Sequence, residues 1–188
     1  MHPLDNMKIS VIIPVYNAET FIEEAVQSAL GQSETGEVIL IEDGSTDNSL
    51  TVCQELEKAS TRVRLLRHPG GGNRGAGPSR NLGILNATYD YIAFLDADDF
   101  YLPGRFAAAS HILAQDPLID GVYGATGIHF ETESARKAWR NSPLHKGRMI
   151  TTMKGRIPPD RLFHALASES GKGVFHTNAI TVKRSLFE

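Results

Sequence analysis

Short apolar runs alternate with amphipathic segments along the first 130 residues of the chain. The first run, Ile9–Val15 (ISVIIPV), is almost continuous, a pattern typical of a strand whose two faces are both buried. The residues Thr20 to Glu23 read as a capping box that opens a helix, with an apolar stripe that begins at Phe21 and Ile22. Similar patterns predict strands at Val38–Ile41, Val63–Leu66, Tyr91–Leu95 and Gly121–Phe130, and helices at Asp47–Ala59, Pro78–Asn86 and Pro103–Gln115.

This alternation of strand and helix with short connections predicts a doubly wound α/β domain with a mostly parallel sheet flanked by helices. The pattern loosens after Phe130. Residues 131–160 read as a loop or a partly helical excursion, followed by a helix near Asp160–Ala167 and a strand near Thr177–Lys183.

Composition and charge exclude several classes of protein. Hydrophobic residues make up 41% of the 188 residues and charged residues 22%, so a disordered chain is excluded. The net charge of −3 gives no overall attraction to nucleic acid. The single cysteine, Cys53, excludes an internal disulfide and a zinc site of several cysteines. No apolar run approaches the roughly 18 residues of a membrane-spanning helix. We expect a cytoplasmic domain, with any attachment to the inner face of a membrane made through parts outside this chain.

Acidic residues follow two of the predicted parallel strands. Asp43 ends the second strand, and Asp96 and Asp98 follow the fourth. Ligands of open α/β sheets bind outside the carboxyl ends of the strands. A D-x-D pair at this edge can hold a hard divalent cation such as Mg²⁺. The alternative is that these acids form turns and cap helices, as we expect for Asp47 and Asp99.

A glycine-rich loop, Gly70–Gly77, precedes the helix at Pro78. It contains a literal G-x-G-x-x-G from Gly70 to Gly75, which makes a dinucleotide site a candidate. Arg74 and Arg80 suit direct pairing with phosphate instead. A flexible surface turn is the third possibility.

Four segments together resemble the family 2 glycosyltransferases. They are Ile9–Glu19 (ISVIIPVYNAE), Val38–Ser49 (VILIEDGSTDNS), Gly77–Ile84 (GPSRNLGI) and Tyr91–Asp99 (YIAFLDADD). The resemblance implies a GT-A fold and an inverting transfer of a sugar from a nucleotide-diphosphate sugar, commonly UDP-linked, to an acceptor hydroxyl. It implies a nucleotide-sugar-binding half in residues 1–130 and a partial acceptor-side half in residues 131–188. The acceptor is expected in a polysaccharide, a glycolipid or a cell-envelope glycan.

The resemblance also assigns residues to the donor site. Asp43 matches the acid that reads the base, and Arg80 the arginine near the diphosphate. Asp96 matches the residue that touches the ribose or a metal-bound water, and Asp98 the direct ligand of Mg²⁺ or Mn²⁺. The other positions expected to line this site are Pro14, Tyr16, Glu19, Arg74 and Ala97. Ser79 stands where the family pattern has alanine.

No residue of the chain stands out as the general base that takes the acceptor proton. The candidates by residue type are Glu131, Glu133, Asp160, Glu169 and His176. The resemblance implies instead an acidic pair that falls after Glu188, so that this chain binds the donor but transfers sugar poorly.

Two other functions and two local alternatives are open at this point. The chain could be a nicotinamide-dependent oxidoreductase that uses the Gly70–Gly75 loop, or a non-catalytic nucleotide-sugar binding module. Residues 131–160 carry seven Lys or Arg against three Asp or Glu, which suits a lipid-linked phosphate acceptor or a membrane surface, or simply a solvated face. Trp139 could stack on a sugar or staple its own loop.

Overall fold

The computed structural model describes residues 7–142, 155–161 and 176–188. The chain divides into two compact units. The first contains Met1–Tyr123 together with Ile180–Glu188, and the second contains Gly124–Ala179. The division of labour expected between residues 1–130 and 131–188 stays a prediction.

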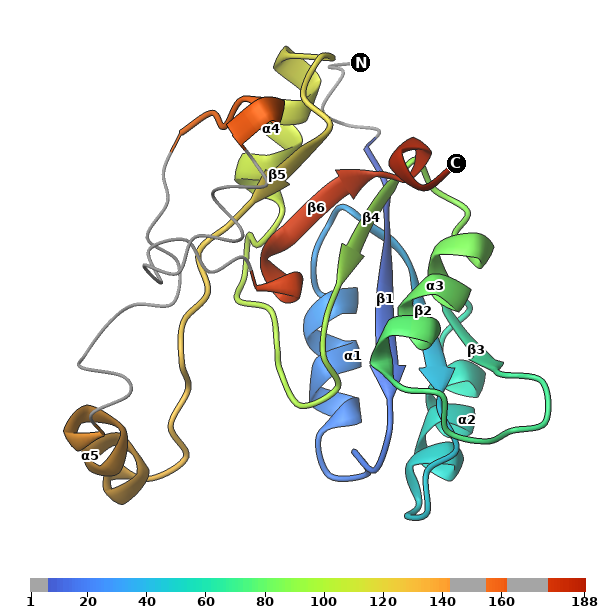
Figure 1. Ribbon diagram of the computed structural model, residues 1–188. Helices are drawn as coiled ribbons and strands as arrows, with labels where there is room; N and C mark the ends of the chain where they lie inside the picture. Colours follow the sequence, from blue (N-terminus) through green and yellow to red (C-terminus); the bar gives the residue numbers. More distant parts are fainter. Residues whose placement is uncertain (1–6, 143–154, 162–175) are drawn as a thin grey trace. The chain divides into compact units, whose positions relative to one another are not determined.

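In the first unit the described residues form a six-stranded sheet in the order β3-β2-β1-β4-β6-β5. Strands β1 to β4 run parallel, whereas β6 is antiparallel to both β4 and β5. This arrangement confirms the predicted mostly parallel α/β sheet (Figure 1). The strands are β1 Ile9–Val15, β2 Thr35–Glu42, β3 Val63–Arg67, β4 Tyr91–Phe94, β5 Gly121–Tyr123 and β6 Ile180–Lys183.

Helices cover both faces of this sheet (Figure 1). On one face, Val11 and Leu40 pack in a cluster with residues of α1 and α2. On the other face, Ile12 and Ile41 pack with residues of α3. Both faces of the central strands are therefore buried, as the continuous apolar run of β1 predicted. The helices of this unit are α1 Ile22–Leu30, α2 Ser49–Ala59, α3 Ala76–Asn86 and α4 Ala107–Gln115.

Helix α3 lies close to the sheet because Gly83 has no side chain. A Cβ atom at this position would come 2.4 Å from Cγ2 of Ile12 and 3.0 Å from Cδ1 of Ile41. A larger residue at position 83 would have to displace the helix or the Ile12 side chain, since a packed core cannot absorb an added methyl group at this distance.

Two local expectations were wrong. Helix α1 has Phe21 as its N-cap and no side-chain capping bond, because the carbonyl of Ala18 accepts the N–H groups of both Phe21 and Ile22. The capping box at Thr20 is therefore absent. The strand expected at Gly121–Phe130 ends at Tyr123, because its described partner β6 pairs only with Gly121–Tyr123.

The second unit contains helix α5, Glu133–Asn141, which agrees with the partly helical segment expected there. The Thr132 hydroxyl caps it by accepting the N–H of Ala135 at 3.1 Å. Trp139 meets Phe130 edge to face, with ring centroids 6.1 Å apart, as a loop staple would. Most of the helix expected at Asp160–Ala167 lies outside the described residues. In the described part of the chain, no helix combines the length and the hydropathy of a membrane span.

A buried carboxylate, Glu37, ties the sheet together near the start of β2. Its Oε1 accepts the Ser10 hydroxyl and the Thr88 N–H, each at 2.7 Å, and its Oε2 accepts Nη1 of Arg64 at 2.9 Å. Burial alone would raise the pKa of Glu37, but these hydrogen bonds outweigh it and lower the pKa below the usual 4.5. Glu37 is therefore a charged carboxylate, and its hydrogen bonds connect β1, β2, β3 and the turn before β4.

We predict that Glu37→Gln lowers the free energy of unfolding at neutral pH by about 1–3 kcal/mol, because buried donors lose a charged acceptor. A carboxylate with a lowered folded pKa stabilises the protein above its unfolded pKa, and this contribution is lost as the pH falls through the folded pKa. Urea unfolding at pH 7 and at pH 3 measures both effects. The difference between the unsubstituted protein and Glu37→Gln should shrink at pH 3, and the exposed Glu24→Gln should change neither value. A constant difference at both pH values would contradict the prediction.

Candidate functional site

A cleft of about 250 Å³ lies at the carboxyl ends of β1, β2 and β4, the edge at which the sequence predicted a ligand site. The acids predicted to meet there, Asp43, Asp96 and Asp98, all contribute to its walls. The full lining is Pro14, Val15, Tyr16, Asn17, Ala18, Phe21, Asp43, Ala76, Asp96, Ala97 and Asp98.

Asp43 is the most constrained of the acids. Only 2% of its surface is exposed, and its backbone N–H donates to the carbonyl of Val15 at 2.9 Å. Its Oδ1 accepts the N–H of Arg74 at 2.8 Å, and its Oδ2 accepts the N–H of Gly75 at 2.7 Å. A buried carboxylate needs such donors. Asp43 thus fastens the glycine-rich loop to the end of β2.

This contact also bears on the dinucleotide interpretation of Gly70–Gly75. In a dinucleotide site, the amides of the loop and of the following helix face a pyrophosphate. Here the N–H groups of Arg74 and Gly75 donate to Asp43 instead. The guanidinium of Arg74 donates to the carbonyl of Pro69 at 3.2 Å, and Arg74 is absent from the lining of the cleft.

Gly44 makes the close approach of the loop possible. Its φ is +73°, a conformation that disfavours residues with a side chain. A Cβ atom there would lie 2.7 Å from the backbone nitrogen of Asn73 and 2.9 Å from the carbonyl oxygen of Gly71. The glycine after Asp43 is therefore required by the loop that Asp43 holds.

A second buried acid, Glu42, supports the same loop and was missed by the sequence analysis. Its side chain is fully buried, and its Oε2 accepts Nε of Arg67 at 2.6 Å. Its Oε1 accepts the N–H of Ser45. The guanidinium of Arg67 also donates to the carbonyl of Gly71 at 3.5 Å. The signal in the sequence was a charged residue at the last position of a buried strand.

The loops after β1 and β2 are clasped together by reciprocal hydrogen bonds. The N–H of Asn17 donates to the Ser45 hydroxyl at 3.1 Å, and the Asn17 side-chain oxygen accepts the N–H of Thr46 at 2.8 Å. Glu19, which was expected to line the cleft, is absent from its lining. Its carboxylate accepts the N–H of Asn48 at 2.7 Å instead. Glu19 therefore shapes the cleft from outside.

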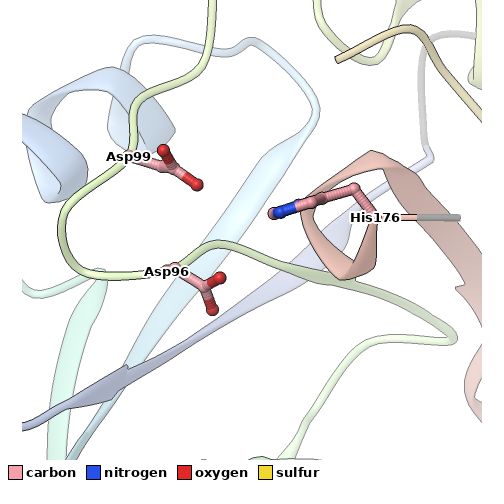
Figure 2. A group of neighbouring side chains, drawn as sticks. All are labelled: Asp96, Asp99 and His176. Carbon is pink, nitrogen blue, oxygen red and sulfur yellow. The ribbon is translucent and has the colours of Figure 1, made fainter. Parts of the chain in front are cut away.

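The loop after β4 presents the acids of the D-x-D pair and their neighbour. Figure 2 draws Asp96 and Asp99 on this loop, and also His176, which belongs to the second unit. The Asp96 carboxylate is bound by the guanidinium of Arg80 from α3 and keeps 30% of its side chain exposed. Asp98 is exposed at the cleft. Carboxylate oxygens with access to solvent are the donors that Mg²⁺ and Mn²⁺ prefer, so Asp96 and Asp98 fit such a cation.

Two aromatic rings stand at the cleft. Tyr16 is 50% exposed and Phe21 is 42% exposed. Phe21 was assigned to the buried stripe of the first helix, but as N-cap of α1 it lies outside the buried face of that helix. Exposed aromatic faces at a cleft that also has carboxylates in its walls suit the stacking of a planar base.

The candidate bases belong to the second unit. Glu133 begins α5 and Glu131 precedes it, and both are exposed. Asp160 and His176 are also in this unit, and Glu169 lies outside the described residues. The first unit therefore contains the predicted donor-site residues, and the second unit contains the candidates for proton transfer.

Comparison with known proteins places the chain in a family. The profile described as Glycosyl transferase family 2 matches residues 10–168. The chain is 35% identical over 162 residues to the uncharacterized glycosyltransferase YibD of Escherichia coli, covering 86% of this chain and 44% of that protein. It is 39% identical over 108 residues to the succinoglycan biosynthesis protein ExoU of Rhizobium meliloti, covering 57% and 30%. The chain thus spans less than half the length of these relatives.

Solved structures of glycosyltransferases share its fold. S. aureus TarS 1–349 in complex with UDP-GlcNAc superposes with a TM-score of 0.58 and 25% identity, covering 67% of this chain and 36% of that one. The mannosyltransferase PcManGT from Pyrobaculum calidifontis, in complex with GDP-Man and Mn²⁺, gives a TM-score of 0.64 over 96% of this chain and 45% of that one. At 20% identity the second likeness shows the fold alone. The predicted GT-A fold is confirmed.

We predict that Gly44→Ala destabilises the protein by about 1–3 kcal/mol, because it adds a side chain at a positive φ and against the loop backbone. Gly72→Ala, in the loop that Gly44 contacts, is the matched control, since a Cβ atom there meets nothing within 4 Å. Urea unfolding compares the two, and hydrogen exchange of the Asn73 to Gly75 amides reports the loop itself. Equal stability of the two variants would contradict the close approach at Gly44.

Proposed function

Because the chain belongs to glycosyltransferase family 2, we propose that it forms the donor-binding part of an inverting glycosyltransferase. The enzyme moves a sugar from a UDP-sugar to an acceptor hydroxyl in the synthesis of a polysaccharide, a glycolipid or a cell-envelope glycan. The observation that carries this proposal is the gathering of Asp43, Asp96 and Asp98 around one cleft at the carboxyl edge of the sheet. The UDP-GlcNAc complex of TarS supports a uridine donor.

In this proposal the base lies at the Asp43 end of the cleft. Each oxygen of Asp43 already accepts one N–H from the loop, and each carboxylate oxygen has a second lone pair. The ring N–H of uracil is a suitable donor to such a lone pair. Tyr16 and Phe21 provide the apolar surface on which the flat base packs.

The diphosphate lies at the Asp96 and Asp98 end. These two carboxylates would hold Mg²⁺ or Mn²⁺, which supplies positive charge for the leaving diphosphate. Asp96 is kept in place by Arg80, so its second oxygen has a fixed direction. Arg80 adds positive charge to the same end of the cleft, where negative charge develops as the anomeric C–O bond breaks. The D-x-D pair and the arginine of α3 thus act together on the leaving group.

Transfer also requires a base for the acceptor hydroxyl. In this proposal Asp43 binds the nucleobase and Asp96 the cation, so neither is left for proton transfer from the acceptor. We assign the base to residues outside the first unit, and the acceptor to a glycan or a lipid-linked glycan. Failure to turn over a UDP-sugar that the protein binds would favour the non-catalytic binding module.

The metal assignment predicts that Asp98→Asn abolishes the Mn²⁺-dependent part of UDP binding, an affinity loss of about tenfold or more, equivalent to at least about 1.4 kcal/mol. The amide keeps the size of the side chain and loses the charge that holds a hard cation. Isothermal titration of UDP with and without Mn²⁺ is the measurement. Glu55→Gln on the exposed side of α2 removes the same charge at a residue that does not line the cleft, and it serves as control. Unchanged affinity in Asp98→Asn would overturn the assignment.

If Asp43 recognises the base, Asp43→Ala should lower the affinity for UDP by about 10- to 100-fold, the range expected for a hydrogen bond to a charged group. The affinity for pyrophosphate should fall by less than about twofold. Gly44→Ala is the matched control, because it disturbs the same loop and keeps the carboxylate. Titration of both ligands in the presence of Mn²⁺ separates the two effects. If both variants lose affinity for UDP and for pyrophosphate by similar factors, Asp43 holds the loop and does not recognise the base.

A further inference from the structure

His68, the first residue after β3, points its ring into the polar region behind Asp43. Its side chain is only 7% exposed, and its Nε2 lies 3.1 Å from the hydroxyl of Ser79 in α3. The same nitrogen lies 3.7 Å from Oδ1 of Asp43. Ser79 is fully buried. Three strand and helix ends therefore meet at one buried cluster of polar side chains.

The surroundings favour one tautomer of the His68 ring. A bare Nε2 could accept the Ser79 hydroxyl, but it would also bring a lone pair within 3.7 Å of the Asp43 carboxylate, which is unfavourable between two buried electron-rich atoms. With the proton on Nε2, the ring donates to the Ser79 hydroxyl and presents its positive edge to Asp43. His68 thus stabilises a buried negative charge that accepts hydrogen bonds from the backbone amides of Arg74 and Gly75.

The contact also restricts the orientation of the carboxylate. Oδ1 lies between the N–H of Arg74, at 2.8 Å, and the ring of His68. A rotation of the Asp43 side chain would break the bonds to Arg74 and Gly75 and move an oxygen away from the imidazole edge. The free lone pairs of Asp43 therefore keep one direction before any ligand arrives, and such preorganisation favours one ligand over its near relatives.

We propose that His68, held by Ser79, is a positioning residue that fixes Asp43 and so sets the nucleobase preference of the donor cleft. The preferred ligand class is a nucleoside diphosphate whose base offers a ring N–H, as uracil does and cytosine does not. The choice of base rests on the proposed function. The fixing of Asp43 and of the loop amides is a property of the protein without ligand, so it is tested separately.

The ligand-free test measures hydrogen exchange of the Arg74 and Gly75 amides by NMR. His68→Leu, which keeps the bulk and loses the ring N–H, should raise both exchange rates by about tenfold, because local opening becomes easier by about 1.4 kcal/mol. His68→Gln, which can still donate to Ser79, should stay near the unsubstituted rate, and Ser79→Ala should lie between them. The amide of Ile12 in the core controls for global unfolding. Unchanged Arg74 and Gly75 rates in His68→Leu, or an equal rise at Ile12, would overturn the proposal.

The ligand test titrates UDP, CDP and pyrophosphate, each with Mn²⁺. His68→Leu should lower the affinity for UDP by about tenfold and reduce the ratio of the UDP affinity to the CDP affinity. The affinity for pyrophosphate should change by less than about twofold. His68→Gln should restore the preference. Equal losses for all three ligands, or an unchanged UDP to CDP ratio, would overturn the role in base selection. If the unsubstituted protein binds none of them, the proposed function fails, and the exchange rates alone decide whether His68 fixes Asp43.

Discussion

The geometry of the cleft depends on one buried charge, the carboxylate of Asp43. A charge with 2% exposure is costly unless its oxygens accept hydrogen bonds, and the donors come from a loop about thirty residues later in the chain. The requirement fixes the loop, and the loop fixes the start of α3, which begins at Ala76 directly after Gly75. Arg80 then lies on α3 at a position from which it binds Asp96. The Asp43 contacts and the Arg80–Asp96 pair are thus connected through the backbone of one loop and one helix.

Buried carboxylates do different work in different parts of the sheet. Glu37 joins strands near the start of β2, Glu42 holds Arg67 and the turn after β2, and Asp43 holds the loop before α3. Glu19 closes one loop on another. Acids of a family motif are therefore not all ligand contacts. In this chain, Asp43 and Glu42 are adjacent in sequence, and only Asp43 lines the cleft.

Features that depend on neighbouring residues in the sequence could be predicted, whereas contacts between distant elements could not. The strands were predictable because a continuous apolar run requires burial on both faces, and the meeting of Asp43 with Asp96 and Asp98 followed from parallel strand ends. The orientation of Phe21 depended on where α1 begins, which the Ala18 carbonyl decides. The roles of Glu42 and His68 depend on partners from other elements, Arg67 and Ser79. No local pattern encodes such pairs, so periodicity and motif spacing could not reveal them.

The two ends of the cleft differ in how they are prepared for a ligand. Asp43, His68 and Ser79 are buried and have polar partners, so in the proposed enzyme the Asp43 end of the cleft keeps its shape without a nucleotide. Asp98 is exposed, so its charge is solvated, and in the proposed enzyme a cation and a diphosphate replace this water. A rigid end discriminates between ligands, because a poorly matched base leaves buried groups unpaired. A solvated end is less selective, because water satisfies its charge when no ligand is bound. In the proposed enzyme, selectivity for the nucleoside therefore comes from the buried end, and the exposed end serves the charge that develops when the sugar leaves.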